Sequence, residues 1–209
     1  LLRKPPPHAP DSVTIYSNAG YIMAGAMLEI VTGEPWEALV TREVFRPLGM
    51  SSAGFGAPGG PGPLRQARGH RRDGTGFRPV DWGPNADNPR VTGPAGSVHA
   101  SLADWGRFVA AHLRGARGDT TYLPRRQWER LHTAGGAGWD YTPGWKRVRD
   151  GEPNGVTLQH LGSNGFWLAQ ASLALDRGYA VLLTANASDD ILEKPFGALL
   201  RSLSEAAPR

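Results

Sequence analysis

The spacing of apolar residues changes once along the chain, and this change limits the folds that the sequence can adopt. Up to residue 132, apolar side chains recur at helical spacing in several segments, whereas four segments within 145–186 have the length and composition of β-strands. Asp176-Arg177-Gly178 reads as a hairpin turn between the last two of these segments. This order predicts an α+β fold, in which helices are segregated from an antiparallel sheet.

Capping residues place the ends of the expected helices. Ser17-Asn18 is a candidate N-cap and Gly33 a candidate stop for a first helix, which is apolar around most of its circumference and is therefore expected to be buried on most sides. Ser101 and Asp104 resemble a capping box. The sequence predicts helices at 18–32, 35–49, 101–113, 124–132 and 191–205, and strands at 145–148, 156–160, 166–175 and 179–186.

The segment 54–96 is rich in Gly, Pro, Arg and Asp and shows little periodicity. It is too long for an ordinary connection, so it predicts a functional loop or an insertion. With 209 residues in all, the chain is expected to form a single domain that contains this segment.

Several chemistries are disfavoured by composition. The chain has no cysteine, which excludes a thiolate nucleophile and a disulfide framework, and its six histidines lack the spacing of metal ligands on a helix, so we expect no metal. The net charge of +4 comes from scattered basic residues, mostly arginine, a pattern that does not predict nucleic-acid binding. No apolar window is long enough for a transmembrane segment.

Two short motifs carry candidate chemistry. Tyr16-Ser17-Asn18 stands where an extended segment meets a helix, so a phenol and a carboxamide could project into one cleft; the alternative is an ordinary helix cap. His160-Leu161-Gly162-Ser163 stands at a strand end, where Gly162 and Gly165 allow a close backbone approach to a ligand.

The order of these motifs, and the residues around them, resemble the serine β-lactamase-like superfamily, in its branch of class C β-lactamases, D-Ala-D-Ala carboxypeptidases and esterases. The resemblance covers residues 12–186 except for the divergent segment 54–90. It rests on Tyr-Ser-Asn-Ala-Gly-Tyr (16–21), Ile-Val-Thr-Gly-Glu (30–34), Val-Phe-Arg-Pro-Leu-Gly-Met-Ser (44–51), the turn and helix start at 94–104, Pro-Gly-Trp (143–145), His-Leu-Gly (160–162), Gly-Phe (165–166) and Leu-Leu-Thr-Ala-Asn (182–186).

The resemblance implies a penicillin-binding or β-lactamase-like fold, a helical lobe beside an antiparallel sheet flanked by helices. Tyr16 matches the tyrosine that shares general-base work, and Asn18 matches an asparagine that binds the substrate amide. His160 and Gly162 stand where β-lactamases carry Lys-Thr-Gly, and the backbone N–H of Ser163 would be an oxyanion donor. The resemblance implies no cofactor, and a small-molecule or peptide substrate as the partner.

One expected motif is absent from the sequence. The family's nucleophile is the serine of Ser-x-x-Lys, and none of the 11 serines in this chain is followed by lysine three residues later. We therefore expect the chain to be the C-terminal part of a serine hydrolase whose missing N-terminal segment carries the nucleophile. The alternatives are a non-catalytic binding or regulatory module with the same fold, and an α+β domain with chance motifs. The family resemblance favours a periplasmic or secreted location, with a cytoplasmic location as the alternative.

Overall fold

Five antiparallel strands in chain order form the main sheet. The structure is a computed structural model, and it describes residues 5, 8–9, 12–60, 66–135, 140–149 and 156–207. The strands run in the order β5 (Tyr141–Thr142), β6 (Trp145–Arg149), β7 (Val156–Ser163), β8 (Leu168–Ala174) and β9 (Tyr179–Ala185). Each strand pairs with the next, which confirms the predicted antiparallel arrangement.

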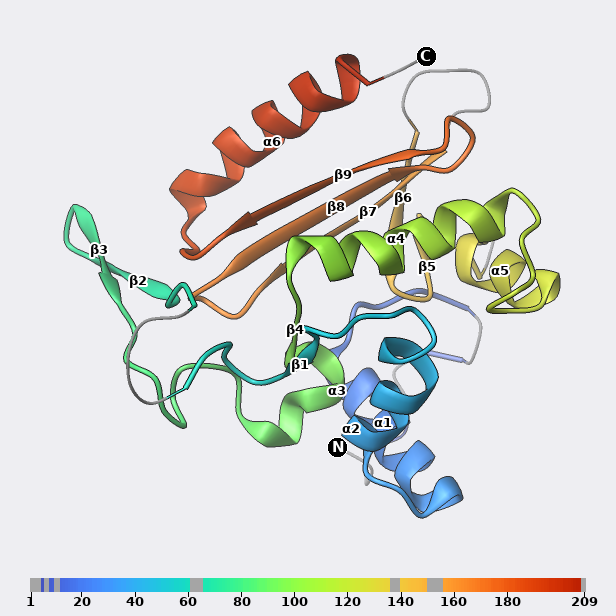
Figure 1. The fold of residues 1–209 in the computed structure, drawn as a ribbon, viewed down its shortest axis with the longest axis horizontal. Helices are drawn as coiled ribbons and strands as arrows, with labels where there is room; N and C mark the ends of the chain where they lie inside the picture. Colours follow the sequence, from blue (N-terminus) through green and yellow to red (C-terminus); the bar gives the residue numbers. More distant parts are fainter. Residues whose placement is uncertain are drawn as a thin grey trace.

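Two long helices cover the two faces of this sheet (Figure 1). α4 (Leu102–Ala116) lies on one face, and α6 (Asp190–Glu205) lies on the other. The alternation of side chains along β9 follows from this arrangement, since Leu182 packs in the core under α4, while Val181 and Leu183 pack with Leu200 of α6. The sheet is therefore buried on both faces.

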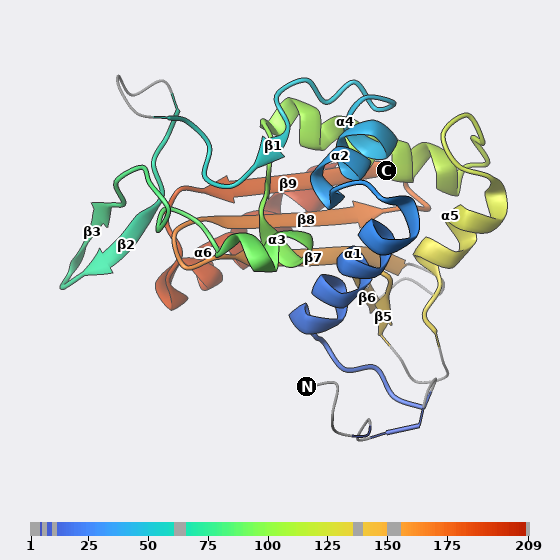
Figure 2. The same cartoon turned by 90° about the horizontal axis from the view of Figure 1, so that it is seen from below.

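A further group of helices and helical turns lies on the α4 side of the sheet and forms the helical lobe (Figure 2). Its members are α1 (Asn18–Thr32), α2 (Trp36–Val40), the π-helical turn η1 (Thr41–Phe45), the 3₁₀ turn η2 (Arg90–Thr92), α3 (Gly93–Gly96) and α5 (Arg125–His132). α1 and α3 meet at Gly25, where a Cβ atom would lie 2.4 Å from the Pro94 ring. Only glycine permits this close approach of the two helices.

The predicted caps of α1 and α6 are confirmed. The Ser17 hydroxyl accepts a hydrogen bond from the Gly20 N–H, and Gly33 ends α1 in the left-handed conformation with a φ of 71°. The Asp189 carboxylate accepts from the Ile191 N–H at the start of α6. Each of these helices therefore begins within one residue of the predicted position.

Of the two hydrogen bonds expected for the capping box of α4, one forms and the other is replaced. The Ser101 hydroxyl accepts from the Asp104 N–H at 3.2 Å, as expected. The Asp104 carboxylate instead turns away from the Ser101 N–H and accepts from the backbone N–H and the hydroxyl of Ser52, each at 2.6 Å. The Ser101 N–H donates to the Ser52 hydroxyl. The contact between Asp104 and Ser52, which are 52 residues apart, thus replaces the local bond to Ser101. The sequence pattern gave no sign of this long-range contact.

The prediction that α1 is buried on most sides is wrong for this chain. Gly25 is the only buried residue of α1, while Met27 is 63% exposed and both Ile30 and Val31 are 82% exposed. In α6, Leu200 is buried, whereas Leu199 and Leu203 are about half exposed. α1 therefore presents apolar surface that no described part of the chain covers.

The segment 54–90 contains short strands that its composition did not predict. β1 (Gly54–Phe55) pairs with β4 (Val98–His99), and β2 (His70–Asp73) forms a hairpin with β3 (Gly76–Pro79). The hairpin projects beyond one end of the main sheet (Figure 1). Residues 61–65 of the segment lie outside the described residues.

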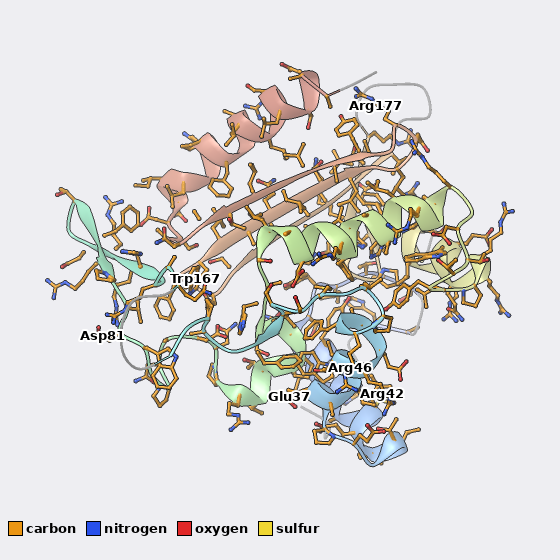
Figure 3. The ribbon with its side chains drawn as sticks, in the orientation of Figure 1. Glu37, Arg42, Arg46, Asp81, Trp167 and Arg177 are labelled. Carbon is orange, nitrogen blue, oxygen red and sulfur yellow. The ribbon has the colours of Figure 1, made fainter. Side chains whose placement is uncertain are left out.

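Contacts fasten the base of the β2–β3 hairpin to the end of the sheet that carries Ser163. The His70 N–H donates to the Phe166 carbonyl at 3.1 Å, and the Asn164 side chain donates to the Asp87 carboxylate at 2.6 Å. Trp167, labelled in Figure 3, packs so closely that a Cβ atom at Gly69 would lie 2.5 Å from its ring nitrogen. The segment 54–90 is thus part of the structure around the β7–β8 turn.

Candidate active site

Tyr16 lies in the extended segment immediately before α1, and its side chain is 63% exposed. Its ring stands edge-on to the ring of Tyr141 in β5, with centroids 6.3 Å apart. Asn18, in the first turn of α1, is exposed as well. Both residues are therefore exposed at one helix start, and neither lines the cavity described below, so their projection into one cleft stays a prediction.

The phenol groups of Tyr16, Tyr21 and Tyr141 lie close enough together to affect one another's pKa. Burial and the nearby charge of Tyr16 raise the pKa of Tyr21, while a hydrogen bond with the Gly144 backbone opposes the rise. Burial and the charges of Tyr16 and Tyr21 raise the pKa of Tyr141. A tyrosine acts as a general base near neutral pH when an adjacent cation stabilises its phenolate. Such a cation has to come from a residue other than these tyrosines.

His160 lies in β7 with its side chain half-buried. Its Nδ1 atom is 2.6 Å from the carbonyl oxygen of Gly144, in the turn between β5 and β6. The ring of Trp145 stands edge-on to the imidazole, with centroids 6.5 Å apart. The imidazole is thus held by a hydrogen bond and by an aromatic contact from the same hairpin.

The β5–β6 hairpin connects the two predicted motifs. Tyr141, at its start, contacts Tyr16, and Gly144, at its turn, binds His160. In the sequence analysis, Pro-Gly-Trp at 143–145 contributed only to the family resemblance. Tyr141 was not predicted to have a role, because its strand, β5, is two residues long. A two-residue strand has no periodicity by which it could be recognised.

Gly162 and Ser163 follow His160 along β7. A Cβ atom at Gly162 would meet nothing within 4 Å, so one side of the backbone there is open, as a close approach by a ligand requires. The Ser163 hydroxyl lies 2.5 Å from the Ser188 hydroxyl and accepts from the Gly165 N–H. The hydroxyl of Ser163 is therefore hydrogen-bonded within the protein, so the group that we consider for the oxyanion is its backbone N–H.

A largely apolar cavity of about 460 Å³ adjoins this strand. Its walls come from α4, α5, the η1 region and the inner face of β6–β8, and they include Trp105, Phe108, Trp128 and Trp145. His160 and Gly162 also line it. The cavity thus extends from the predicted site into the interface between the helical lobe and the sheet.

His112 of α4 lies in the cavity wall and pairs with His132 of α5. His112 Nδ1 and His132 Nε2 are 3.0 Å apart, and the His112 ring packs among the rings of Phe108, Trp128 and Trp145. Burial, with a smaller contribution from His132, lowers the pKa of His112 to about 3. His112 is therefore neutral and packs as a core side chain.

Two further observations concern the described part of the chain. It holds no group of three or more His, Cys, Asp or Glu side chains placed to bind a metal ion. None of its helices combines the length and the apolar composition that crossing a membrane would require.

A helical lobe packed beside an antiparallel sheet, with Tyr-x-Asn before a lobe helix and His-x-Gly on a sheet strand, defines a protein of the penicillin-binding and β-lactamase-like class. The family model described as Beta-lactamase matches residues 1–203. The chain therefore belongs to the Beta-lactamase family, and the predicted fold class is confirmed.

Named relatives agree with this assignment. The chain is 34% identical over 117 residues to "Unguisins hydrolase ungD" of Aspergillus violaceofuscus, a match that covers 53% of this chain and 20% of that protein. It is 34% identical over 106 residues to "Penicillin-binding protein 4" of Amycolatopsis lactamdurans, with 50% and 27% covered. The solved structure of SurE superimposes with a TM-score of 0.78 and 26% identity over 99% of this chain and 48% of SurE. The chain thus spans about half of SurE, and its matches to the two curated relatives cover smaller shares of them.

Proposed function

We propose that this chain is the C-terminal part of a serine hydrolase that cleaves an amide or an ester through an acyl-enzyme. The observation that carries the proposal is the convergence of Tyr16 and His160 on one hairpin, through Tyr141 and Gly144 respectively. Two motifs that lie far apart in the sequence, each matching a family motif, are thereby brought to a common element beside the cavity.

Each residue has a role in this proposal. The serine of a Ser-x-x-Lys motif outside this sequence attacks the substrate carbonyl, and Tyr16 shares with that lysine the transfer of the serine proton to the leaving group. The lysine is the cation that a tyrosine base needs. The Ser163 backbone N–H, next to the open side of Gly162, stabilises the oxyanion, and Asn18 binds the substrate amide. Water then attacks the acyl-enzyme carbonyl and releases the acid.

The His160 side chain indicates the substrate class. Where β-lactamases carry a lysine, this chain has an imidazole, which lacks the permanent positive charge of the lysine ammonium and so offers no fixed charge to a substrate carboxylate. We therefore assign an esterase or peptidase activity rather than an efficient β-lactamase activity.

Uncovered surfaces support the need for a further segment. The apolar face of α1, with Ile30 and Val31 82% exposed, is not covered by any described part of the chain. β9 pairs with β8 alone among the described strands, so one of its edges is free to accept another strand. A segment that contributes a helix and strands would cover both surfaces.

The test is a covalent-labelling experiment on the full-length natural protein. The protein is challenged with a fluorophosphonate or with penicillin, and the adduct is mapped by mass spectrometry. An adduct on a serine that lies N-terminal to Leu1 supports the proposal. An intact, folded protein that forms no adduct refutes it and removes the catalytic roles of Tyr16 and His160.

One observation favours a second function, that of a non-catalytic binding or regulatory module. None of the 11 serines in this chain has the Ser-x-x-Lys spacing, so the nucleophile is not among its own residues. A full-length gene that encodes no such motif, together with saturable binding of a peptide or ester and no turnover, would establish this second function.

A further inference from the structure

The hydrogen bond between His160 and Gly144 has only one possible polarity. A carbonyl oxygen accepts but never donates, so the proton of the 2.6 Å contact belongs to Nδ1 of His160. In a neutral imidazole the other nitrogen, Nε2, then carries a lone pair and no proton. The backbone of Gly144 therefore selects one of the two neutral tautomers of His160.

The β5–β6 turn fixes the direction of the Gly144 carbonyl. Gly144 has a φ of 91°, a backbone conformation that residues with a side chain rarely adopt. Lack of space is not the reason for a glycine at this position, because an added Cβ atom would meet nothing within 4 Å. On either side of the turn, Thr142 pairs with Trp145 and Tyr141 pairs with Lys146. The glycine is thus needed for the direction of the backbone.

The opposite side of the imidazole is available. No residue in the described ranges donates a hydrogen bond to Nε2, and His160 lines the cavity together with Gly144 and Gly162. The contact with Trp145 limits rotation of the ring. An unprotonated Nε2 in this setting is a fixed acceptor for an N–H donor and gives no attraction to a carboxylate.

We propose that the Gly144 carbonyl is a positioning group that holds His160 as the Nδ1–H tautomer, so that Nε2 accepts a hydrogen bond from an ammonium or amide N–H of the substrate. The site thereby selects substrates that present such a donor over those that present a carboxylate at the same place. This inference rests on the proposed function for its substrate, while the tautomer of His160 is a property of the fold alone.

The first experiment reads the tautomer directly. The full-length natural protein is labelled with ¹⁵N-histidine, and two-bond ¹H–¹⁵N spectra are recorded above neutral pH, with His160 assigned by its loss in His160→Gln. A protonated Nδ1 and an unprotonated Nε2 are expected; a proton on Nε2 overturns the proposal. Titration with phenylalanine amide is expected to shift the Nε2 resonance, and a shift confined to other histidines also overturns the proposal.

Two glycine variants separate positioning from strain. Gly144→Ala and Gly33→Ala both place an alanine at positive φ with nothing within 4 Å of its Cβ, but Gly33 ends α1 and does not contact His160. Gly144→Ala is expected to mix the two tautomers of His160, and Gly33→Ala to leave the spectrum of His160 unchanged. Equal effects of both variants would mean that the Gly144 carbonyl has no special role.

The second experiment measures selectivity with three p-nitroanilides of phenylalanine, in which the α-nitrogen is free, acetylated or succinylated. The free and acetylated compounds present an N–H donor without a carboxylate, and the succinylated compound adds the carboxylate. We expect kcat/KM to favour the first two by roughly tenfold, and His160→Lys to shift the ratio toward the succinylated compound by a similar factor. An unchanged ratio in His160→Lys overturns the selectivity. Failure of all three substrates counts against the proposed function, while the tautomer remains decided by the spectra.

Discussion

His112 Nδ1 and His132 Nε2 are joined by a 3.0 Å hydrogen bond that links α4 to α5 inside a ring of aromatic side chains. Burial is the main reason that the pKa of His112 falls from 6.5 to about 3, and the pKa of His132 is lowered by burial as well. The folded protein thus keeps both rings neutral at pH values where the unfolded chain binds protons.

This pair predicts a loss of stability in mild acid. Because the folded pKa of His112 is depressed, its effect on stability is absent above pH 6.5 and grows as the pH falls from 6.5 toward about 3. His112→Phe, which keeps an aromatic ring among aromatic neighbours, should flatten this part of the profile. Urea midpoints of the full-length protein from neutral pH to about pH 5 would measure it, with His8→Phe at an exposed histidine as the control. The two stability predictions that follow refer to the full-length protein as well. Parallel profiles for the wild type and His112→Phe would contradict the assignment.

Asp104 should control stability at lower pH. Hydrogen bonds from the Ser52 side chain and backbone, and then the Arg107 guanidinium, hold the pKa of Asp104 below its usual value of 3.8. The stabilisation is therefore complete above that value and is lost as the pH falls below it. Asp104→Asn should lower the melting temperature by several degrees at neutral pH and reduce the slope of the acid limb. Asp81→Asn, at a side chain that is 93% exposed, should leave both unchanged.

The contact between α1 and α3 predicts opposite effects for two helical glycines. Gly25→Ala places a Cβ atom 2.4 Å from Pro94 and should destabilise the protein by about 1–3 kcal/mol, because the two helices have to move apart. Gly106→Ala in α4 meets nothing within 4 Å and should stabilise by about 0.5–1 kcal/mol. Denaturant unfolding of the two variants provides the comparison, and equal signs would refute the assigned role of Gly25.

Tyr16 carries a prediction for catalysis. In the full-length protein, Tyr16→Phe removes the hydroxyl and keeps the edge-on ring contact with Tyr141, so kcat should fall by roughly 10²–10⁴-fold with little change in folding. Tyr179→Phe is the matched control, because the Tyr179 hydroxyl bonds the Ser204 carbonyl on the α6 side of the sheet. Turnover within twofold or so of the wild type in Tyr16→Phe would remove Tyr16 from the general-base step.

The exposed face of α1 predicts the behaviour of the 209-residue chain by itself. Met27, Ile30 and Val31 should bind an environment-sensitive apolar dye, and the chain should unfold without a sharp transition. Replacement of Ile30 and Val31 by serine should reduce dye binding more than Val91→Ser does, since Val91 is exposed on η2. A cooperative thermal transition of a monomer with low dye binding would contradict this expectation.

The sequence was sufficient where structure is local. The caps at Ser17, Gly33 and Asp189 and the order of the four long strands depend on neighbours a few residues away, and these predictions are confirmed. The burial of α1 was predicted wrongly because an apolar helix indicates that a partner exists but says nothing of where that partner lies in the sequence.

The candidate site could be predicted only in part, for the same reason. Tyr16 and His160 belong to short sequence motifs that can be recognised. Tyr141 lies in a two-residue strand, and Gly144 contacts His160 only through its backbone carbonyl, so neither has a sequence motif of its own. A carbonyl is common to every residue, so its role depends on where the turn directs it. The link from Asp104 to Ser52 likewise depends on tertiary structure, and no pattern of spacing could reveal it.

The attachment of the segment 54–90 has an evolutionary consequence. Its base is fastened by His70 to Phe166 and by Asp87 to Asn164, while Gly74 at the tip of the β2–β3 hairpin, with a φ of 58°, projects away from these contacts. The tip can therefore gain or lose residues across generations without disturbing the strand that carries His160. The protrusion is therefore a place where relatives can differ in length and where a protein engineer could graft a peptide.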